Sequence, residues 1–348
     1  MSGRVYLDHN ASAPLRGEAR DAMLAALDLA GNPSAIHAEG RTARAVVEHA
    51  RAQVAAALGA EGADIVFTSG ATEAAALACA GRDLVCAPVE HAAVGAWCRP
   101  ELPVARDGSI APPDPSRAAL QAANPETGVL QDLPVGLAVS DATQAFGKVA
   151  FAFDASGIEM IFVSAHKIGG PKGVGALVLR RGLDLRARIR GGGQEMGRRS
   201  GTENVAAIAG FGAAAEAAAR DLRAGAWDAV AQRRDRLERA LESEASGTIC
   251  IARTSPRLPN TTMLATPGWK GETQVMQLDL AGFAISAGSA CSSGKLRGSG
   301  TLAAMGHDEL TAGSAIRVSL GLMTTDEDID RFAECWLSRR SRHQARAA

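Results

Sequence analysis

Lys167 is one of only five lysines in the 348-residue chain, and its surroundings suit nucleophilic chemistry. It lies in the stretch Ser-Ala-His-Lys-Ile-Gly-Gly-Pro-Lys-Gly (164–173), which follows the apolar run 160–163, a pattern typical of a buried strand. Arginine supplies most of the basic residues, so a lysine is most readily kept where an amine must be neutral and nucleophilic, which a guanidinium cannot be. A surface lysine in a Gly-rich turn is the alternative interpretation.

An acidic side chain marks a second predicted strand end. Asp141 begins the sequence Asp-Ala-Thr-Gln (141–144), one residue beyond the apolar stretch 137–139. A lysine and an acid at two strand ends are what a pyridoxal phosphate (PLP) enzyme needs. The lysine carries the cofactor as a Schiff base, and the acid pairs with the pyridinium nitrogen so that the ring can accept electrons. Gln144 could bond the phenolic oxygen of such a cofactor.

Three further stretches could contact a flat, phosphorylated ligand. His91 follows a predicted strand end and could stack on a ring, although a capping or surface histidine is the alternative. The turn 69–73 joins a strand to a helix, where backbone N–H groups suit a phosphate, but ordinary helix caps have the same composition. The Gly-rich segment 191–195, which leads to 199–202, is another phosphate candidate or a flexible loop.

Cys291 differs from the other five cysteines, which have apolar neighbours. It lies among small residues in the segment 286–295, so we expect an accessible, reactive thiol. No C-x-x-C pair and no His cluster at metal spacing is present, which argues against a zinc site or a disulfide framework. Arg317 lies inside an apolar strand pattern and needs a partner, either a substrate carboxylate or an internal ion pair.

The overall composition excludes several classes of function. The net charge is −1, and aromatic residues make up only 4% of the chain, so neither nucleic acid nor a membrane surface is an expected partner. No apolar run is long enough to span a membrane, and the first residues enter a strand-like segment without room for a signal peptide. The sequence therefore predicts a cytoplasmic enzyme.

Strands and helices alternate through the first two thirds of the chain, which predicts an α/β fold with a mainly parallel sheet. A helical region from about 202 is followed by shorter strands and helices. We expect a large domain at 16–248 and a small C-terminal α+β domain at 249–348, which carries the Cys291 loop. The N-terminal arm, 1–15, is expected on the side of the small domain.

Nine stretches, spread in order over residues 5 to 330, resemble the cysteine desulfurases of the nitrogenase and iron–sulfur cluster assembly type. These belong to the class V aminotransferase-like PLP enzymes and have PLP-dependent transferase fold type I. The stretches are YLDHNASAPL (6–15), GNPSAIH (31–37), FTSGATE (67–73), EHAAV (90–94), DATQ (141–144), SAHKIGGPKGVGAL (164–177), GGGQEMGRRSGTENV (191–205), SAGSACSSG (286–294) and IRVSLG (316–321).

The resemblance implies a homodimeric enzyme that converts L-cysteine to L-alanine and moves the sulfur to Cys291 as a persulfide. It implies that Lys167 binds PLP and moves the Cα proton, with Asp141, Gln144 and His91 around the ring. The residues implied at the phosphate are Ala71, Thr72, Ser164, His166 and, from the partner subunit, Thr202. Those implied at the substrate are Asn32, His37, Asn124 and Arg317. A protein sulfur acceptor, either a cluster scaffold or a sulfur carrier, would follow.

Two departures from the family pattern keep other functions open. Pro125 stands where the family has an asparagine that contacts cofactor and substrate, and Asn124 is the candidate to replace it. The segment 132–136 is also too short for the helix that normally precedes the strand at 137–140. A related PLP lyase or aminotransferase, for instance one acting on selenocysteine, and a degenerate non-catalytic paralogue are the alternatives.

Overall fold

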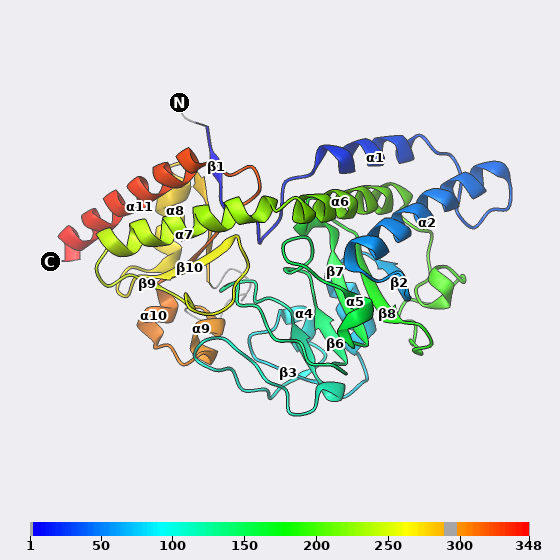
Figure 1. The fold of residues 1–348 in the computed structure, drawn as a ribbon, viewed down its shortest axis with the longest axis horizontal. Helices are drawn as coiled ribbons and strands as arrows, with labels where there is room; N and C mark the ends of the chain where they lie inside the picture. The colour runs from blue at the N-terminus through cyan, green and yellow to red at the C-terminus, as the bar shows by residue number, and fades with distance from the viewer. Residues whose placement is uncertain (1–2, 289–297, 348) are drawn as a thin grey trace.

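The computed structural model describes residues 3–288 and 298–347 (Figure 1). Its central sheet contains, in spatial order, β2 (Ala63–Thr68), β8 (Gly175–Arg180), β7 (Met160–Ser164), β6 (Val139–Asp141) and β5 (Ala119–Gln121). β8 is antiparallel to both of its neighbours, whereas β5, β6 and β7 are parallel. A parallel bridge from Val85 to Ala118 connects this sheet to the pair β3 (Val85–Cys86) and β4 (Arg99–Pro100). The prediction of a mainly parallel α/β sheet is confirmed.

Both faces of the central sheet are covered because its strands are apolar on both sides. Phe67 and Val163 point to one face and pack with α2 (Ala38–Leu58) and α6 (Val205–Arg223). Their chain neighbours Val66 and Phe162 point to the other face, against α3 (Ala71–Cys79). α1 (Gly17–Leu27) packs on α6, as Figure 1 shows. This alternation is the two-residue period of a strand.

The helical segments between β3 and β7 are short. α4 (Ala92–Gly95) and α5 (Phe153–Ser156) have four residues each, the 3₁₀ turn η1 (Pro115–Arg117) has three, and no other helical segment is described there. α4 lies on the α3 side, whereas Phe153 of α5 packs in the core with α2 and α6. Residues 131–138 contain no helix, as the short sequence there predicts. Loops therefore surround this edge of the sheet (Figure 1).

A second, antiparallel sheet has the order β12 (Ser286–Ala287), β13 (Ala315–Ser319), β10 (Thr261–Ala265) and β9 (Ile249–Cys250). α7 (Ala226–Glu244) and α8 (Gly271–Asp279) contact its strands, and α11 (Asp326–Ala347) packs against both of these helices. α9 (Gly300–Ala304) and α10 (Glu309–Gly313) lie at its lower end in Figure 1. β1 (Val5–Tyr6) pairs with β11 (Phe283–Ala284), so the N-terminal arm joins this part of the molecule.

The change from one core to the other comes earlier than the predicted boundary at 248. Leu237 and Leu241 of α7 pack in the second apolar core, with Phe332 of α11. α6 ends at Arg223, and Gly225 then adopts the left-handed conformation (φ 68°) that separates the two helices. Within the described residues, no helix is both long enough and apolar enough to cross a bilayer.

Candidate active site

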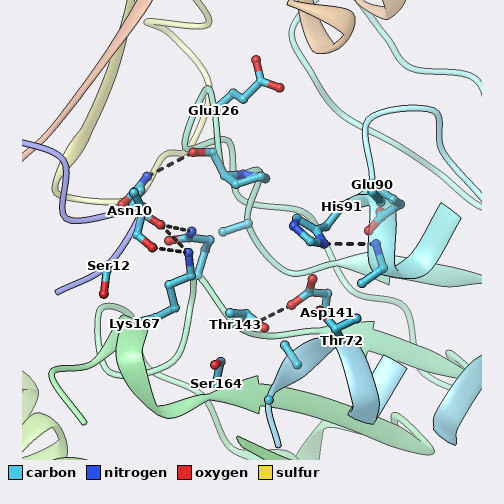
Figure 2. A pocket seen from close by; sticks show the side chains of 18 of the residues that line it. Asn10, Ser12, Thr72, Glu90, His91, Glu126, Asp141, Thr143, Ser164 and Lys167 are labelled. Atoms are coloured by element: carbon cyan, nitrogen blue, oxygen red, sulfur yellow. Dashed lines mark hydrogen bonds between the residues drawn. The ribbon is translucent and has the colours of Figure 1, made fainter. Parts of the chain in front are cut away.

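A cavity of about 860 Å³ is lined by residues of both sheets and of the N-terminal arm. It lies at the carboxyl ends of β6 and β7, the edge of a parallel sheet where ligands generally bind. Asp141 is the last residue of β6, and Lys167 follows β7 in the 3₁₀ turn η2 (Ala165–Lys167). Figure 2 shows these two side chains in the same cavity, as the sequence predicts.

The amine of Lys167 is held by the N-terminal arm. Its Nζ donates to the backbone carbonyl of Asn10 at 2.6 Å and to that of Ala11 at 3.0 Å. The arm therefore determines where the amine lies inside the cavity. The sequence motif that contains Asn10 was visible, but nothing in it indicated a contact with a residue 157 positions away.

Asp141 is a desolvated carboxyl group at the bottom of this site. Burial raises its pKa, although a hydrogen bond from the Thr143 backbone (N to Oδ1, 2.9 Å) and the nearby His91 and Lys167 act in the opposite direction. An acid in such a place is ready to pair with a cation. A protonated ring nitrogen would be such a partner.

Three residues that line the cavity have a buried polar atom without a hydrogen-bond partner among the described residues. These atoms are Glu90 Oε2, Thr143 Oγ1 and Arg317 Nε. Buried polar atoms are normally satisfied, because leaving one unpaired costs about 1–3 kcal/mol. The cavity is therefore suited to a ligand that carries several polar groups, as PLP does.

His91 is both a helix cap and a cavity residue. Its Nδ1 accepts a hydrogen bond from the Ala93 backbone N–H at 3.1 Å and so begins α4. That bond puts the proton of the neutral ring on Nε2 and fixes the side chain at the cavity wall (Figure 2). The alternative interpretation of a capping histidine is thus compatible with a role at the ligand.

The strand-to-helix turn at Gly70 forms a second wall, with Ala71 and Thr72 in the first turn of α3. Gly70 has φ 154° and ψ 179°, a conformation that residues with a side chain rarely adopt. A Cβ atom there would lie 4.0 Å from Ser164 Oγ, so the turn and the end of β7 are adjacent. Free N–H groups at the start of α3 make this wall a suitable phosphate site.

His166 lies beside this wall as a neutral imidazole. Burial, followed by the charges of Lys167 and Lys172, lowers its pKa to about 4. Its Nδ1 is 3.3 Å from Ser12 Oγ of the N-terminal arm. A neutral imidazole can donate a hydrogen bond to a phosphate oxygen without being titrated near pH 7.

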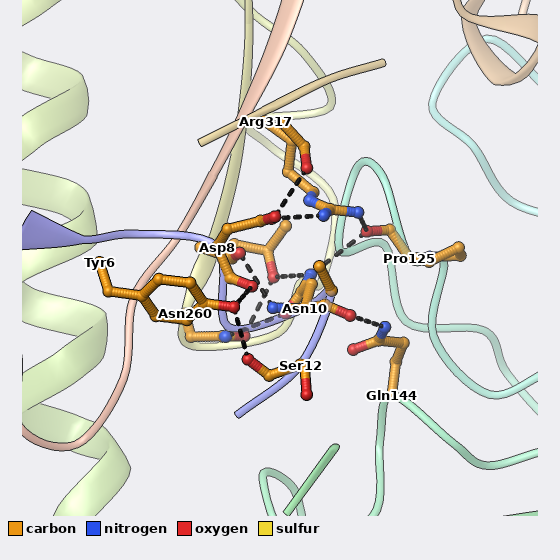
Figure 3. A network of polar contacts seen from close by, with 12 residues as sticks. Tyr6, Asp8, Asn10, Ser12, Pro125, Gln144, Asn260 and Arg317 are labelled. Carbon is orange, nitrogen blue, oxygen red and sulfur yellow. Dashed lines mark hydrogen bonds and ion pairs between the residues drawn. The ribbon is translucent and has the colours of Figure 1, made fainter. Parts of the chain in front are cut away.

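Arg317 reaches the cavity from β13, in the second sheet. Its Nη2 donates to Asp8 Oδ1 at 2.6 Å and its Nη1 to the carbonyl of Pro125 at 3.0 Å (Figure 3). The internal ion pair, one of the two partners that the sequence left possible for Arg317, is therefore present. Arg317 Nε is buried without a partner in the described part of the chain, and Arg317 lines the cavity, so the guanidinium can still receive a carboxylate.

Four predicted residues do not line this cavity: Asn32, His37, Asn124 and Thr202. Asn32 and Thr202 are exposed, and exposed His37 caps α2 through its Nδ1. Asn124 is buried, and its Oδ1 accepts hydrogen bonds from the backbone and side chain of Thr127. Its amide oxygen is thus used within its own turn, while its Nδ2 donates to the Val89 carbonyl and to Gln121 Oε1 at 3.4 and 3.5 Å, so the amide is occupied outside the cavity.

Cys291 lies outside the described residues. The structure describes the chain on both sides of it. Ser286 and Gly288 line the cavity, and after the gap Ser299 and Thr301 donate hydrogen bonds to the carboxyl group of Glu126, at 2.6 and 2.8 Å. Glu126 itself lines the cavity, so described residues before and after Cys291 in the sequence lie at the cavity.

The sequence matches the aminotransferase class-V family over residues 5–97 and 110–332. A cysteine desulfurase from Cereibacter sphaeroides is 41% identical, with 95% of this chain and 94% of the relative covered. A cysteine desulfurase IscS from Dictyoglomus turgidum is 36% identical, with 95% and 93% covered. The break in the family match falls within the region where the helices are short.

Solved structures give the same relationship. A NifS-like protein from Rickettsia africae superposes with a TM-score of 0.87 at 30% identity, with 97% of this chain and 99% of that chain covered. A structure described as SspA in complex with cysteine has a TM-score of 0.74 at 26% identity, with 92% and 100% covered.

Proposed function

The chain belongs to the aminotransferase class-V family, and we propose that it is a PLP-dependent cysteine desulfurase that converts L-cysteine to L-alanine. The observation that carries the proposal is the meeting of Lys167, Asp141 and Arg317 at one cavity. An amine, a desolvated acid and a carboxylate-binding guanidinium are the groups that PLP chemistry on an amino acid requires.

The cavity residues fit the cofactor at each of its polar groups. Lys167 would hold it covalently, Asp141 would pair with the ring nitrogen, and His91 would stack on the ring. Gln144 would bond the phenolic oxygen. The residues proposed at the phosphate are Ala71, Thr72, Ser164 and His166. When bound, PLP supplies an electron sink for negative charge at the substrate Cα.

The substrate would be held between this site and the second sheet. Arg317 would bind the carboxylate of L-cysteine, while Asp8 and Pro125 hold the guanidinium from the other side. Lys167 would take the proton from Cα, because its amine lies in the same cavity.

The sulfur step belongs to Cys291. Its thiolate would form a bond to the substrate sulfur while the Cβ–S bond breaks, with the electron pair of that bond remaining on carbon. Protonation of the carbon then gives alanine, and the enzyme keeps a persulfide. The sulfur becomes oxidised and the carbon reduced, so L-cysteine and one thiol are converted without an added oxidant.

We further propose a homodimer in which Thr202, Asn32 and His37 complete the cavity of the partner subunit. The proposal rests on the exposure of these residues, with the apolar side chains of Leu27 and Ile36 also 66% and 91% exposed in the same part of the sequence as Asn32 and His37. A protein acceptor, either a cluster scaffold or a sulfur carrier, would receive the sulfur for iron–sulfur cluster assembly or another sulfur transfer. The five described cysteines are free thiols, the state kept in a reducing cytoplasm.

Pro125 favours one second candidate. Because both ends of the Asn124 amide are hydrogen-bonded outside the cavity, no residue at 124 or 125 offers an amide to the cavity in place of the family's second asparagine. A related PLP lyase with another sulfur or selenium amino acid as substrate would accommodate that change. Comparing L-cysteine with L-selenocysteine as substrates distinguishes the two candidates.

The test is to measure PLP absorbance, alanine release and protein persulfide with L-cysteine and a reductant. The wild type should show all three. Cys291→Ala should keep the absorbance but lose alanine and persulfide, and Lys167→Ala should lose the covalent absorbance band. Cys335→Ala is the matched control, because Cys335 packs beside the second core away from the cavity. Alanine release by Cys291→Ala at the wild-type rate would refute the role of Cys291.

A further inference from the structure

A second lysine is buried close to Lys167. Lys148 is only 3% exposed, and among the described residues no carboxylate forms an ion pair with it. Lysine is almost never buried to this degree without a charged partner. Burial, followed by the charges of Lys167 and Arg317, holds the pKa of its amine well below the usual range.

The amine of Lys148 makes two described hydrogen bonds, both to side-chain amide oxygens. Its Nζ donates to Gln144 Oε1 at 2.8 Å and to Asn10 Oδ1 at 3.1 Å. Asn10 Oδ1 also receives a hydrogen bond from Asn260 Nδ2 at 3.1 Å, whereas Lys148 is the one described donor to Gln144 Oε1. Gln144 therefore depends on Lys148, and Asn10 does not.

An amine that donates to one end of an amide decides which way the amide points. With Oε1 on Lys148, the Nε2 of Gln144 must face the opposite direction, and it donates to the Asn10 carbonyl at 2.9 Å (Figure 3). That carbonyl also accepts from Lys167 Nζ. The N–H face of Gln144 is thus turned toward the amine that would carry the cofactor.

We propose that Lys148 is a positioning residue that fixes the amide of Gln144 with its N–H group toward the phenolic oxygen of the cofactor. This inference rests on the proposed PLP site. A donor at that oxygen stabilises its negative charge most when the Schiff-base nitrogen of Lys167 has lost its proton. Lys148 thereby keeps the pKa of that nitrogen low, which favours the reactive, unprotonated amine of an incoming substrate.

Other groups around Lys148 do not supply this orientation. Arg317 is paired with Asp8. His9 has its pKa lowered to about 4, mainly by burial and then by Lys148, so it is neutral near pH 7. Lys167 faces Lys148 across the Asn10 carbonyl and is the group whose titration is observed.

The experiment is a pH titration of the visible absorbance of the PLP-bound protein, which follows protonation of the Lys167 linkage without measuring turnover. Lys148→Met leaves Gln144 Oε1 without a donor, and we expect the absorbance pKa to rise by about one pH unit, the effect of losing one hydrogen bond. Gln144→Leu should raise it equally. The double variant should show no further rise, because both changes remove the same interaction. Lys270→Met, at an exposed lysine, should have no effect.

Lys148→Gln keeps an N–H donor without a positive charge, so it should restore most of the wild-type absorbance pKa, and it also serves if Lys148→Met does not fold. Thermal unfolding of the cofactor-free variants, followed by circular dichroism, distinguishes a general loss of stability from a specific effect on the absorbance pKa. If the absorbance pKa of Lys148→Met is unchanged, or if the pKa shifts of the two single variants add in the double variant, the positioning role of Lys148 is overturned and the proposed function is not. A wild-type protein without any band would overturn the proposed function itself.

Discussion

Removing the carboxylate of Asp8 should destabilise the protein far more than removing an exposed one. The Asp8 and Arg317 side chains are 16% and 10% exposed, and the ion pair joins the N-terminal arm to β13 over 2.6 Å. Ser286 Oγ also donates to Asp8 Oδ2 at 2.8 Å. Asp8→Ala leaves a buried guanidinium without its carboxylate, a change that costs about 3–5 kcal/mol. Asp8→Asn keeps one acceptor and should cost about 2 kcal/mol.

The assay is urea unfolding of the cofactor-free protein, followed by far-ultraviolet circular dichroism. Asp279→Ala is the matched control, because Asp279 and Arg4 form an ion pair whose side chains are 56% and 55% exposed, and such pairs contribute about 0–1 kcal/mol. In the PLP-bound enzyme, Asp8→Ala should also raise KM for L-cysteine about tenfold, since Arg317 loses the contact that orients it. An Asp8→Ala protein as stable as Asp279→Ala would refute the reasoning.

Three further variants test other parts of the structure. The folded-state pKa of His166 is about 4 and the unfolded value about 6.5, so the stability from its neutral ring is complete above pH 6.5 and is lost as the pH falls to 4. Over that pH interval, the free energy of unfolding of the cofactor-free wild type, measured in urea titrations, should fall by up to about 3 kcal/mol more than that of His166→Asn. Glu238→Ala should lower the free energy of unfolding by about 3–5 kcal/mol, because it leaves the buried guanidinium of Arg257, whose side chain is 4% exposed, without its carboxylate. The double variant Glu238→Leu with Arg257→Met should recover most of this stability in thermal melts. Asp141→Asn should lower the rate of alanine formation by about 100-fold. The same change should make the cofactor-free protein about 1 kcal/mol more stable, because burial disfavours the charged carboxylate. A less stable variant would contradict this.

The meeting of Lys167 and Asp141 could be predicted from the sequence because both follow apolar strand segments. Parallel strands present their carboxyl ends at one edge of a sheet, so residues just beyond those ends come together whatever the intervening chain does. The turn at Gly70 also follows an apolar strand segment, so its position at the same edge could be predicted in the same way. These predictions needed only local patterns and one general rule of sheet topology.

Residues that act over long sequence separations could not be predicted in this way. Asp8 meets Arg317 across 309 positions, and no local pattern records such a pairing. The amphipathic pattern of α7 shows that one face is apolar, but not that this face packs in the second core. α11 continues to Ala347, and within it His343 stacks on Trp269 with ring centroids 5.6 Å apart, another contact that no local pattern records.

The N-terminal arm connects the two halves of the chemistry. Asp8 orients the guanidinium proposed for the substrate carboxylate, and two residues later the Asn10 carbonyl holds the amine of Lys167. The side chain of Asn10 meanwhile accepts from Lys148 and donates to the carbonyl of Pro125 at 3.2 Å. Because the carbonyl and the carboxylate belong to one short segment, in which the Ala11 N–H donates to the Asp8 carbonyl at 3.0 Å, a shift of the arm must move the amine and the guanidinium together. The distance between the proton-transfer group and the carboxylate-binding group is therefore set by the backbone of the arm. The pairing of β1 with β11 and the bridge from Asp8 to Ser319 of β13 anchor that backbone, the latter to the second sheet.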